Sequence, residues 1–295
     1  MPTSHHNMQA ILFVCLGWLS FAAADGFSKY LVQSYPVTSI LLVNGVIGTV
    51  ISLIWMASRY NLRDIVNPKF KLHLLRMVWT TGTSFSVVHA LKYLPLADFY
   101  GISFLSPFFI ALLAFFFLQE KLGWRRFMAM AVAFTGVLIL AGPQYQTHNV
   151  GLIWAFMVPV FVALNALTVR KIGTGEPLPL FPLFPFVGMI ILNGVLAFTP
   201  GHAVVLPETG DLLYFIGCTL GVIGGLLGFA NGFARASESV VVAPFLYTQM
   251  IWGVLIGMIF FNTTPTATTL MGAALIIAAG LFSFYREYRI AHKKP

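Results

Sequence analysis

Four ionisable side chains lie inside long apolar stretches, where a charge is costly unless it is paired or has a function. The first two, Asp25 and Lys29, are four residues apart and therefore share one helix face. They could form an ion pair near the outer end of their helix, with Lys29 reaching toward the interface. Alternatively, Asp25 could meet a cationic or hydrogen-bonding part of a substrate, or carry a coupling proton.

The other two, Arg76 and His89, belong to the stretch 72–93. Arg76 lies about one turn inside this stretch, and we expect it to extend to the nearby interface, although it could bind a phosphate or carboxylate. His89 lies near the far end of the stretch. Its imidazole could carry a proton because it titrates near neutral pH, or it could be a hydrogen-bonded residue of helix packing.

Polar and aromatic residues recur at matching depths in the stretches 96–118 and 239–261. Those in the first stretch follow the three-and-four spacing of one helix face. The group comprises Tyr100, Ser103, Phe104, Tyr247, Gln249 and Trp252. Polar groups avoid lipid, so we expect them to face inward, where rings with hydroxyl and amide groups suit a flat heterocycle. Helix packing is the alternative.

Two amides, Asn165 and Asn231, also lie in apolar stretches. Each could bind a substrate or join helices by hydrogen bonds. Four glycines between Gly221 and Gly228 lie in an apolar stretch with no strand before them, which excludes a phosphate-binding loop. Their spacing favours close helix contact, within one bundle or in a dimer.

Enzyme and metal signatures are absent from the sequence. It contains no H-E-x-x-H, no G-x-S-x-G and no nucleotide-binding loop. Cys15 and Cys218 both fall in apolar stretches, which argues against a disulfide or a thiolate metal site. We therefore expect no catalytic residue, no metal and no cofactor.

The composition indicates which elements must position these residues. Of the 295 residues, 58% are hydrophobic and 9% charged, whereas soluble domains have about 25% charged residues. The apolar residues form runs of roughly the length that crosses a bilayer. We predict an all-α polytopic membrane protein with ten transmembrane helices. They cover residues 9–30, 36–58, 72–93, 96–118, 127–141, 150–169, 180–199, 212–234, 239–261 and 270–285.

The basic residues orient these helices. If both termini lie on one side, 14 of the 17 Lys and Arg residues lie in the loops and tail of that side. The positive-inside rule then predicts cytoplasmic termini. Because the charges sit in short loops, the net charge of +8 reflects membrane topology and not nucleic-acid binding.

An internal repeat relates the two halves of the chain. Residues 90–136 align without a gap on residues 234–280, at an offset of 144. In this alignment Phe116 meets Phe260 and Gly136 meets Gly280. Two halves of five helices each must enter the membrane in opposite directions, which places a binding site near the midplane between inverted repeats. We expect repeats at 9–142 and 150–285 and a basic tail at 286–295.

Short motifs give the chain a family resemblance. They are LKYLPLAD at 91–98, SP at 106–107 and FFLQEKLGWRR at 116–126, with ARAS at 234–237 and VVAP at 241–244 in the second half. With these motifs the chain resembles the EamA domain of the drug/metabolite transporter superfamily. The resemblance implies ten helices in two EamA repeats, cytoplasmic termini in a bacterial inner membrane, and transport of small metabolites. One departure is that FNTTP at 261–265 replaces the acidic residue that follows the ninth helix in many members.

Two stretches narrow the resemblance. Residues 25–30 and 240–252 look most like members that take up riboflavin or S-adenosylmethionine. The expected function is secondary transport of a small metabolite by alternating access, with an amino-acid or drug exporter of the same fold as the alternative. An intramembrane enzyme or a non-transporting sensor fits less well, because catalytic motifs and an output domain are missing. The expected partners are a small-molecule substrate, the lipid bilayer and a second copy of the chain, without nucleic acid.

Overall fold

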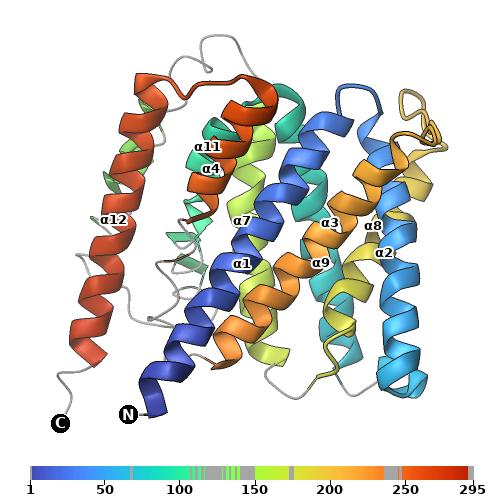
Figure 1. The fold of residues 1–295 in the computed structure, drawn as a ribbon, viewed down its shortest axis with the longest axis horizontal. Coiled ribbons are helices and arrows are strands. Elements are labelled where there is room, and N and C mark those ends of the chain that lie inside the picture. Colours follow the sequence, from blue (N-terminus) through green and yellow to red (C-terminus); the bar gives the residue numbers. More distant parts are fainter. Residues whose placement is uncertain are drawn as a thin grey trace.

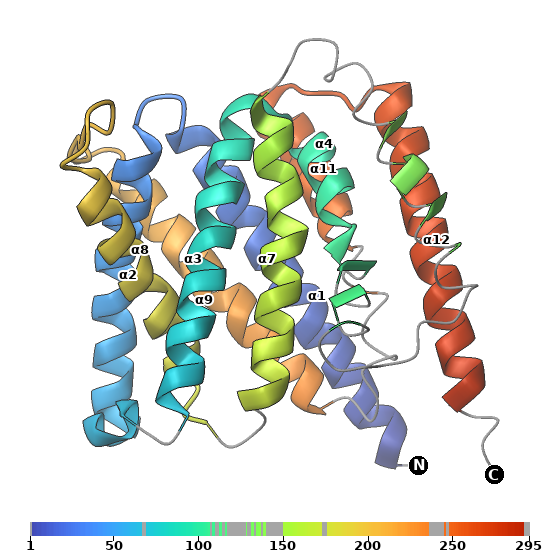
Figure 2. The same cartoon turned by 180° about the vertical axis from the view of Figure 1, so that it is seen from behind.

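The computed structural model describes residues 2–66, 69–106, 150–172, 176–235, 245 and 248–291, together with single residues between 108 and 139. Every element in this part of the chain is helical (Figures 1 and 2). The first half contains α1 (Pro2–Leu31), α2 (Val37–Arg59), the 3-10 helix η1 (Leu62–Ile65), α3 (Phe70–Tyr93) and α4 (Leu96–Ser103). The second half contains α7 (Val150–Ile172), α8 (Leu180–Leu196), α9 (Leu212–Arg235), α11 (Thr248–Phe261) and α12 (Ala267–Ala291).

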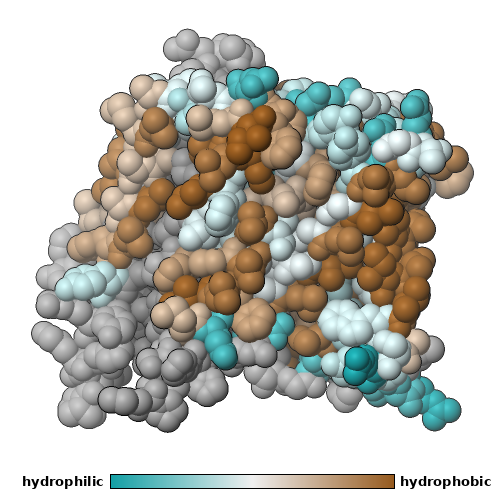
Figure 3. Space-filling view, viewed as in Figure 1, coloured by the Kyte–Doolittle hydropathy of each residue, from teal (hydrophilic) through white to brown (hydrophobic). Residues whose placement is uncertain are grey.

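The helices run side by side, and α1 begins at the same face of the bundle at which α12 ends (Figure 1). We call this the terminal face and the other end of the bundle the opposite face. Two helical segments combine the length and apolar composition of a membrane span, Met8–Leu31 and Val37–Arg59. Five shorter apolar segments accompany them in α7, α8, α9, α11 and α12. Apolar residues also cover much of the described part of the face seen in Figure 3.

Most predicted helices match the structure within a few residues, but the fourth is interrupted by a turn. Within the predicted helix at 96–118, α4 ends at Ser103, a turn follows at Phe104 and Leu105, and the residues described between 106 and 116 are helical again. The sequence explains the break, because Pro107 has no N–H to donate to the carbonyl oxygen of Ser103. The Ser106 hydroxyl donates to that carbonyl instead, at 2.5 Å. Of the fifth predicted helix, 127–141, the structure describes residues 128, 131–132, 134–136 and 138–139, and all of these are helical.

Glycines allow the most extensive helix contact in the described part of the bundle, between α1 and α9. A Cβ atom at Gly221 would lie 2.8 Å from the carbonyl oxygen of Ser20, and one at Gly228 would lie 2.7 Å from that of Phe13. Neither backbone oxygen can move aside, so only glycine fits these positions. The prediction of close helix contact is confirmed, and the contact lies within the bundle.

Candidate functional site

Three helices meet at the carboxylate of Asp25 in α1. The Tyr100 hydroxyl of α4 donates a hydrogen bond to Asp25 Oδ2 at 2.7 Å. Gln249 Nε2 of α11 donates to the same oxygen at 3.4 Å. Tyr100 is buried, whereas Asp25 and Gln249 are half-buried. Side chains from both halves of the chain therefore hold this carboxylate. We call Asp25, Tyr100 and Gln249 the carboxylate site.

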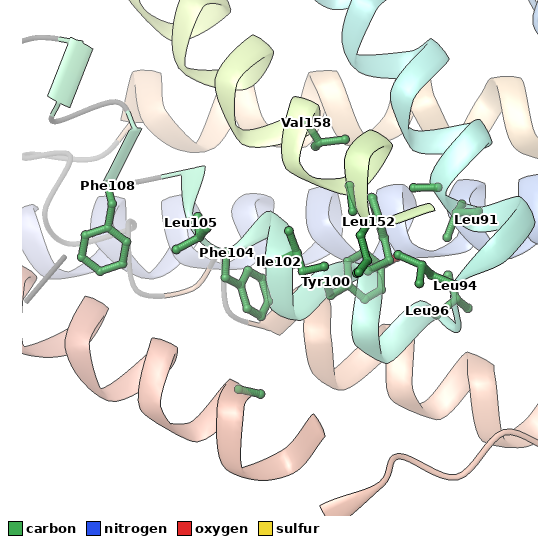
Figure 4. Packing of buried hydrophobic residues seen from close by; sticks show 14 of the residues in the cluster. Leu91, Leu94, Leu96, Tyr100, Ile102, Phe104, Leu105, Phe108, Leu152 and Val158 are labelled. Atoms are coloured by element: carbon green, nitrogen blue, oxygen red, sulfur yellow. The ribbon is translucent and has the colours of Figure 1, made fainter. Parts of the chain in front are cut away.

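A glycine determines where the Tyr100 ring lies. Gly253 lies one helical turn beyond Gln249 on α11, and a Cβ atom there would overlap the Tyr100 ring. The ring therefore occupies space that any other residue at position 253 would fill. On its other sides Tyr100 packs among apolar side chains of α3, α4 and α7, including Leu91, Leu96 and Leu152 (Figure 4). This packing fixes the direction in which the hydroxyl points.

The expected ion pair between Asp25 and Lys29 is wrong. Lys29 Nζ donates instead to the carbonyl oxygens of Leu91 at 2.6 Å and Leu94 at 2.9 Å. These carbonyls lie at the C-terminal end of α3, where backbone oxygens have no helical partner and attract a cation. No Lys, Arg or His of the described ranges forms an ion pair with Asp25. Lys29 is therefore not the partner of the Asp25 carboxylate.

We expected Arg76 to extend to the membrane interface, but its side chain is buried inside the bundle. Its side chain is 2% exposed and lies between α3 and α8. Arg76 Nη1 donates to the carbonyl oxygen of Phe181 at 2.9 Å, and its guanidinium carbon lies 5.0 Å from the centre of the Phe181 ring. That carbonyl has no helical partner because the residue four positions later is Pro185. Arg76 thus replaces a missing backbone donor.

His89 has the surroundings of a packing residue. Its Nδ1 lies 2.9 Å from the carbonyl oxygen of Phe85 in its own helix, so this nitrogen carries the proton. The imidazole packs against the rings of Phe85 and Trp154, with centroid distances of 4.1 and 4.8 Å. None of these contacts leads to the carboxylate site.

The remaining predicted residues of α4 and α11 divide into two groups. Ser103 donates to the carbonyl oxygen of Phe99 in its own helix at 2.9 Å, and Phe104 is 2% exposed within an apolar cluster. Both contribute to packing. In contrast, the indole Nε1 of Trp252, one turn from Gln249, is buried without a hydrogen-bond partner among the described residues. Tyr247 lies outside these residues.

The two predicted amides also differ. Asn231 Nδ2 donates to the carbonyl oxygen of Leu227 in its own helix at 2.9 Å. Asn165 is half-buried, and its Oδ1 is buried without a partner in the described part of the chain. A third amide, Asn44, joins α2 to α9 through Cys218 and Thr219, each at 3.2 Å. This is the helix-joining role that the sequence analysis allowed for such amides.

One further buried carboxylate, Asp98, was not expected from the sequence to have a role. Asp98, which is 7% exposed, accepts a hydrogen bond from the Thr269 hydroxyl at 2.6 Å. Each residue lies in the first turn of its helix, α4 or α12, where an acidic side chain is stabilised by the helix dipole. In the sequence, the acidic residue three positions after Pro95 is typical of the first turn of a helix. Asp98 joins two helix starts and lies outside the carboxylate site.

Among the described residues, no three His, Cys, Asp or Glu side chains lie close enough together to hold a metal ion. The geometry of the carboxylate site itself is suited to binding. It offers a hydrogen-bond acceptor at Asp25 and a buried indole donor nearby on α11.

Comparisons with known proteins agree on one family. The model of the EamA-like transporter family matches residues 8–142. A riboflavin transporter of Rhizobium johnstonii is 31% identical over 227 residues, which cover 76% of this chain and 72% of the relative. An S-adenosylmethionine uptake transporter of Rickettsia bellii is 24% identical over 95% of this chain and 96% of the relative.

Two further similarities span almost the whole chain. A riboflavin transporter of Vibrio cholerae is 25% identical over 96% of this chain and 95% of the relative. A protein of known crystal structure has a TM-score of 0.64 to this chain at 17% sequence identity. The structural alignment covers 97% of this chain and 99% of the chain of that protein. The chain therefore shares its fold with a solved protein.

Proposed function

Because this chain belongs to the EamA-like transporter family, and is thus a small-molecule transporter of the membrane and not an enzyme, we propose that it takes up a metabolite with a flat ring and several hydrogen-bond donors. Riboflavin is the first candidate. It combines a flat heterocycle with donors on its ring and side chain, and two of the relatives are named riboflavin transporters. The observation that carries the proposal is the Asp25 carboxylate held by Tyr100 and Gln249, which come from different halves of the chain.

The site supplies complementary groups for such a molecule. Asp25 would accept hydrogen bonds from the substrate, and Trp252 Nε1 would donate one, because both groups have capacity left in the described protein. Buried polar groups gain most from a partner when water is excluded. Asn165 Oδ1 offers a further acceptor on α7 if the substrate reaches that helix.

The same carboxylate supports S-adenosylmethionine as a second candidate. No cation of the described chain pairs with Asp25, and a lone carboxylate among apolar helices favours a cationic ligand that neutralises it. S-adenosylmethionine has a sulfonium and an ammonium group as well as a flat adenine ring. An amino-acid or drug substrate, with transport in the export direction, is the remaining alternative.

We further propose that residues 9–142 and 150–285 form two inverted repeats of five helices each. The packing is reciprocal in the described helices. α1 of the first half lies against α9 of the second, α7 of the second half lies against α3 of the first, and α2 lies against α8. Inverted halves place the carboxylate site between them and suit alternating access.

The same reasoning orients the protein. The terminal face would be cytoplasmic in a bacterial inner membrane, because the positive loops of the sequence belong to that face. Residues 286–295 would form a basic tail there. A homodimer through an outer face of the bundle would leave the site within each copy.

The test is solute counterflow in proteoliposomes. Purified protein is reconstituted with unlabelled riboflavin or S-adenosylmethionine inside, and labelled compound is added outside. Accumulation of one label above empty liposomes supports the proposal and identifies the substrate. Absence of counterflow and of binding for both compounds, while an amino acid or drug exchanges, would refute it.

A further inference from the structure

Polar contacts join the two halves of the chain at both faces of the bundle, and both lie on the side formed by α2 and α8. At the terminal face, Glu176 from the connection between α7 and α8 contacts the start of α3. Its Oε1 lies 3.3 Å from Lys69 Nζ, and its Oε2 lies 3.3 Å from His73 Nε2. His73 is fully buried and stacks on Phe184 of α8 with a centroid distance of 5.0 Å. We call Lys69, His73 and Glu176 the terminal clasp.

At the opposite face, Tyr35 from the connection between α1 and α2 contacts the start of α9. Its hydroxyl donates to Asp211 Oδ2 at 2.7 Å and accepts from the Glu208 backbone N–H at 3.0 Å. The Tyr35 ring meets the edge of Phe215 at a centroid distance of 5.3 Å. We call Tyr35, Glu208 and Asp211 the opposite clasp.

The two clasps occupy equivalent positions in the two halves. In each, the connection between the first two helices of one half holds the start of the third helix of the other half. Glu176 follows Tyr35 by 141 residues, and Asp211 follows Lys69 by 142 residues. Both separations are close to the offset of 144 that aligns the repeats. The clasps are therefore reciprocal contacts of the same kind.

Between the clasps, α2 and α8 pack too closely to separate easily. A Cβ atom at Gly45 would lie 3.0 Å from the carbonyl oxygen of Phe186, and one at Gly48 would overlap the Phe186 ring. Both helices lie at one side of the bundle, and α12 stands at the other side (Figures 1 and 2). The tight α2–α8 contact thus connects one clasp to the other.

A gate of an alternating-access transporter must break on the face that opens. The two clasps lie on opposite faces and are formed at the same time, so they do not behave as gates that alternate. We propose that the α2–α8 side is the hinge, which keeps both clasps intact throughout transport, while the side that contains α4 and α12 opens. This inference rests on the transport function proposed above and adds the axis of the motion.

The experiment measures distances between spin labels in proteoliposomes by double electron–electron resonance. The background carries Cys15→Ser and Cys218→Ser, which removes both native cysteines. Two pairs next to the clasps report on the hinge, Gln33→Cys with Thr209→Cys and Lys71→Cys with Leu178→Cys; Leu178 is half-buried and the other three residues are exposed. A third pair, Tyr93→Cys with Thr264→Cys, reports on the α4–α12 side at the opposite face.

We expect one distance for each clasp pair, unchanged when riboflavin or S-adenosylmethionine is added. For the third pair we expect two distances, or one that shifts on addition. Two distances at either clasp, or a single unchanging distance at all three pairs, would overturn the hinge. Counterflow in the same proteoliposomes reports on the substrate separately, so a wrong substrate is distinguishable from a wrong hinge.

Discussion

Replacement of Gly253 by alanine tests how the carboxylate site is built. The added methyl group would overlap the Tyr100 ring, which is buried and cannot yield without moving its hydroxyl away from Asp25. Overpacking of this kind costs about 1–3 kcal/mol of stability. Loss of a hydrogen bond to a charged group costs about 1.5–3 kcal/mol, and the two effects need not add because they involve the same ring.

The assay compares thermal unfolding in detergent with binding of the substrate that counterflow identifies. Gly194→Ala on α8 is the matched control, since a Cβ atom there has no neighbour within 4 Å. We expect the control to be neutral or stabilising by up to about 1 kcal/mol. Gly253→Ala should unfold at a lower temperature and bind the substrate more weakly.

A double variant separates packing from chemistry. Tyr100→Ala removes the ring that the new methyl group overlaps, so Gly253→Ala should cost little stability in that background. Binding should remain weak, because the phenol is gone. If Gly253→Ala alone unfolds and binds like the wild type, the ring is not held as described and the reasoning fails.

Four further substitutions give defined expectations. Tyr100→Phe keeps the ring and removes the donor to Asp25, so titration should show about tenfold weaker substrate binding with a smaller change in stability; unchanged affinity would exclude the hydroxyl from the site. Trp252→Phe removes the unpartnered indole N–H and should also raise the Kd, while an unchanged Kd would mean that the substrate does not use this donor. Arg76→Met leaves the Phe181 carbonyl without its donor. The free energy of unfolding should fall by about 1–3 kcal/mol, and the unfolding temperature should fall with it. An unfolding temperature equal to that of the wild type would contradict this role. Gly228→Ala places a methyl group against the Phe13 carbonyl and should destabilise the α1–α9 contact more than Gly194→Ala does, and equal unfolding temperatures would contradict the close approach.

The helices were largely predictable because apolar runs of membrane length leave few alternatives to an α-helix. Where the chain departs from a regular helix, a proline explains it. Pro107 accounts for the end of α4 at Ser103, and Pro185 accounts for the free carbonyl that Arg76 binds. The prolines were visible in the sequence, but their partners on other helices were not.

The carboxylate site was predictable in its residues and not in its pairing. Asp25, Tyr100 and Gln249 were each singled out, because polar groups in apolar stretches are costly unless they have a partner. Helix spacing suggested Lys29 as the partner of Asp25, since both lie on α1. The tertiary fold instead brings the end of α3 to Lys29 and brings α4 and α11 to Asp25. Contacts between helices decide which side chains pair, and residue spacing within one helix carries no information about those contacts.

Asp98 illustrates the same limit. Its place in the first turn after Pro95 predicted a helix start, but its hydrogen bond to Thr269 depends on two helices 171 residues apart in the chain. Nothing in either local sequence indicates that these helix starts meet.

The most direct test of the account compares Asp25→Asn with Asp98→Asn by equilibrium binding of the transported substrate to purified protein. Each variant removes one buried or half-buried carboxylate charge, and Asp98 lies outside the carboxylate site. We predict at least about tenfold weaker binding for Asp25→Asn, the loss expected for a hydrogen bond to a charged group, and near wild-type affinity for the folded Asp98→Asn protein. Equal affinities for the wild type and Asp25→Asn would contradict the claim that the substrate binds at Asp25.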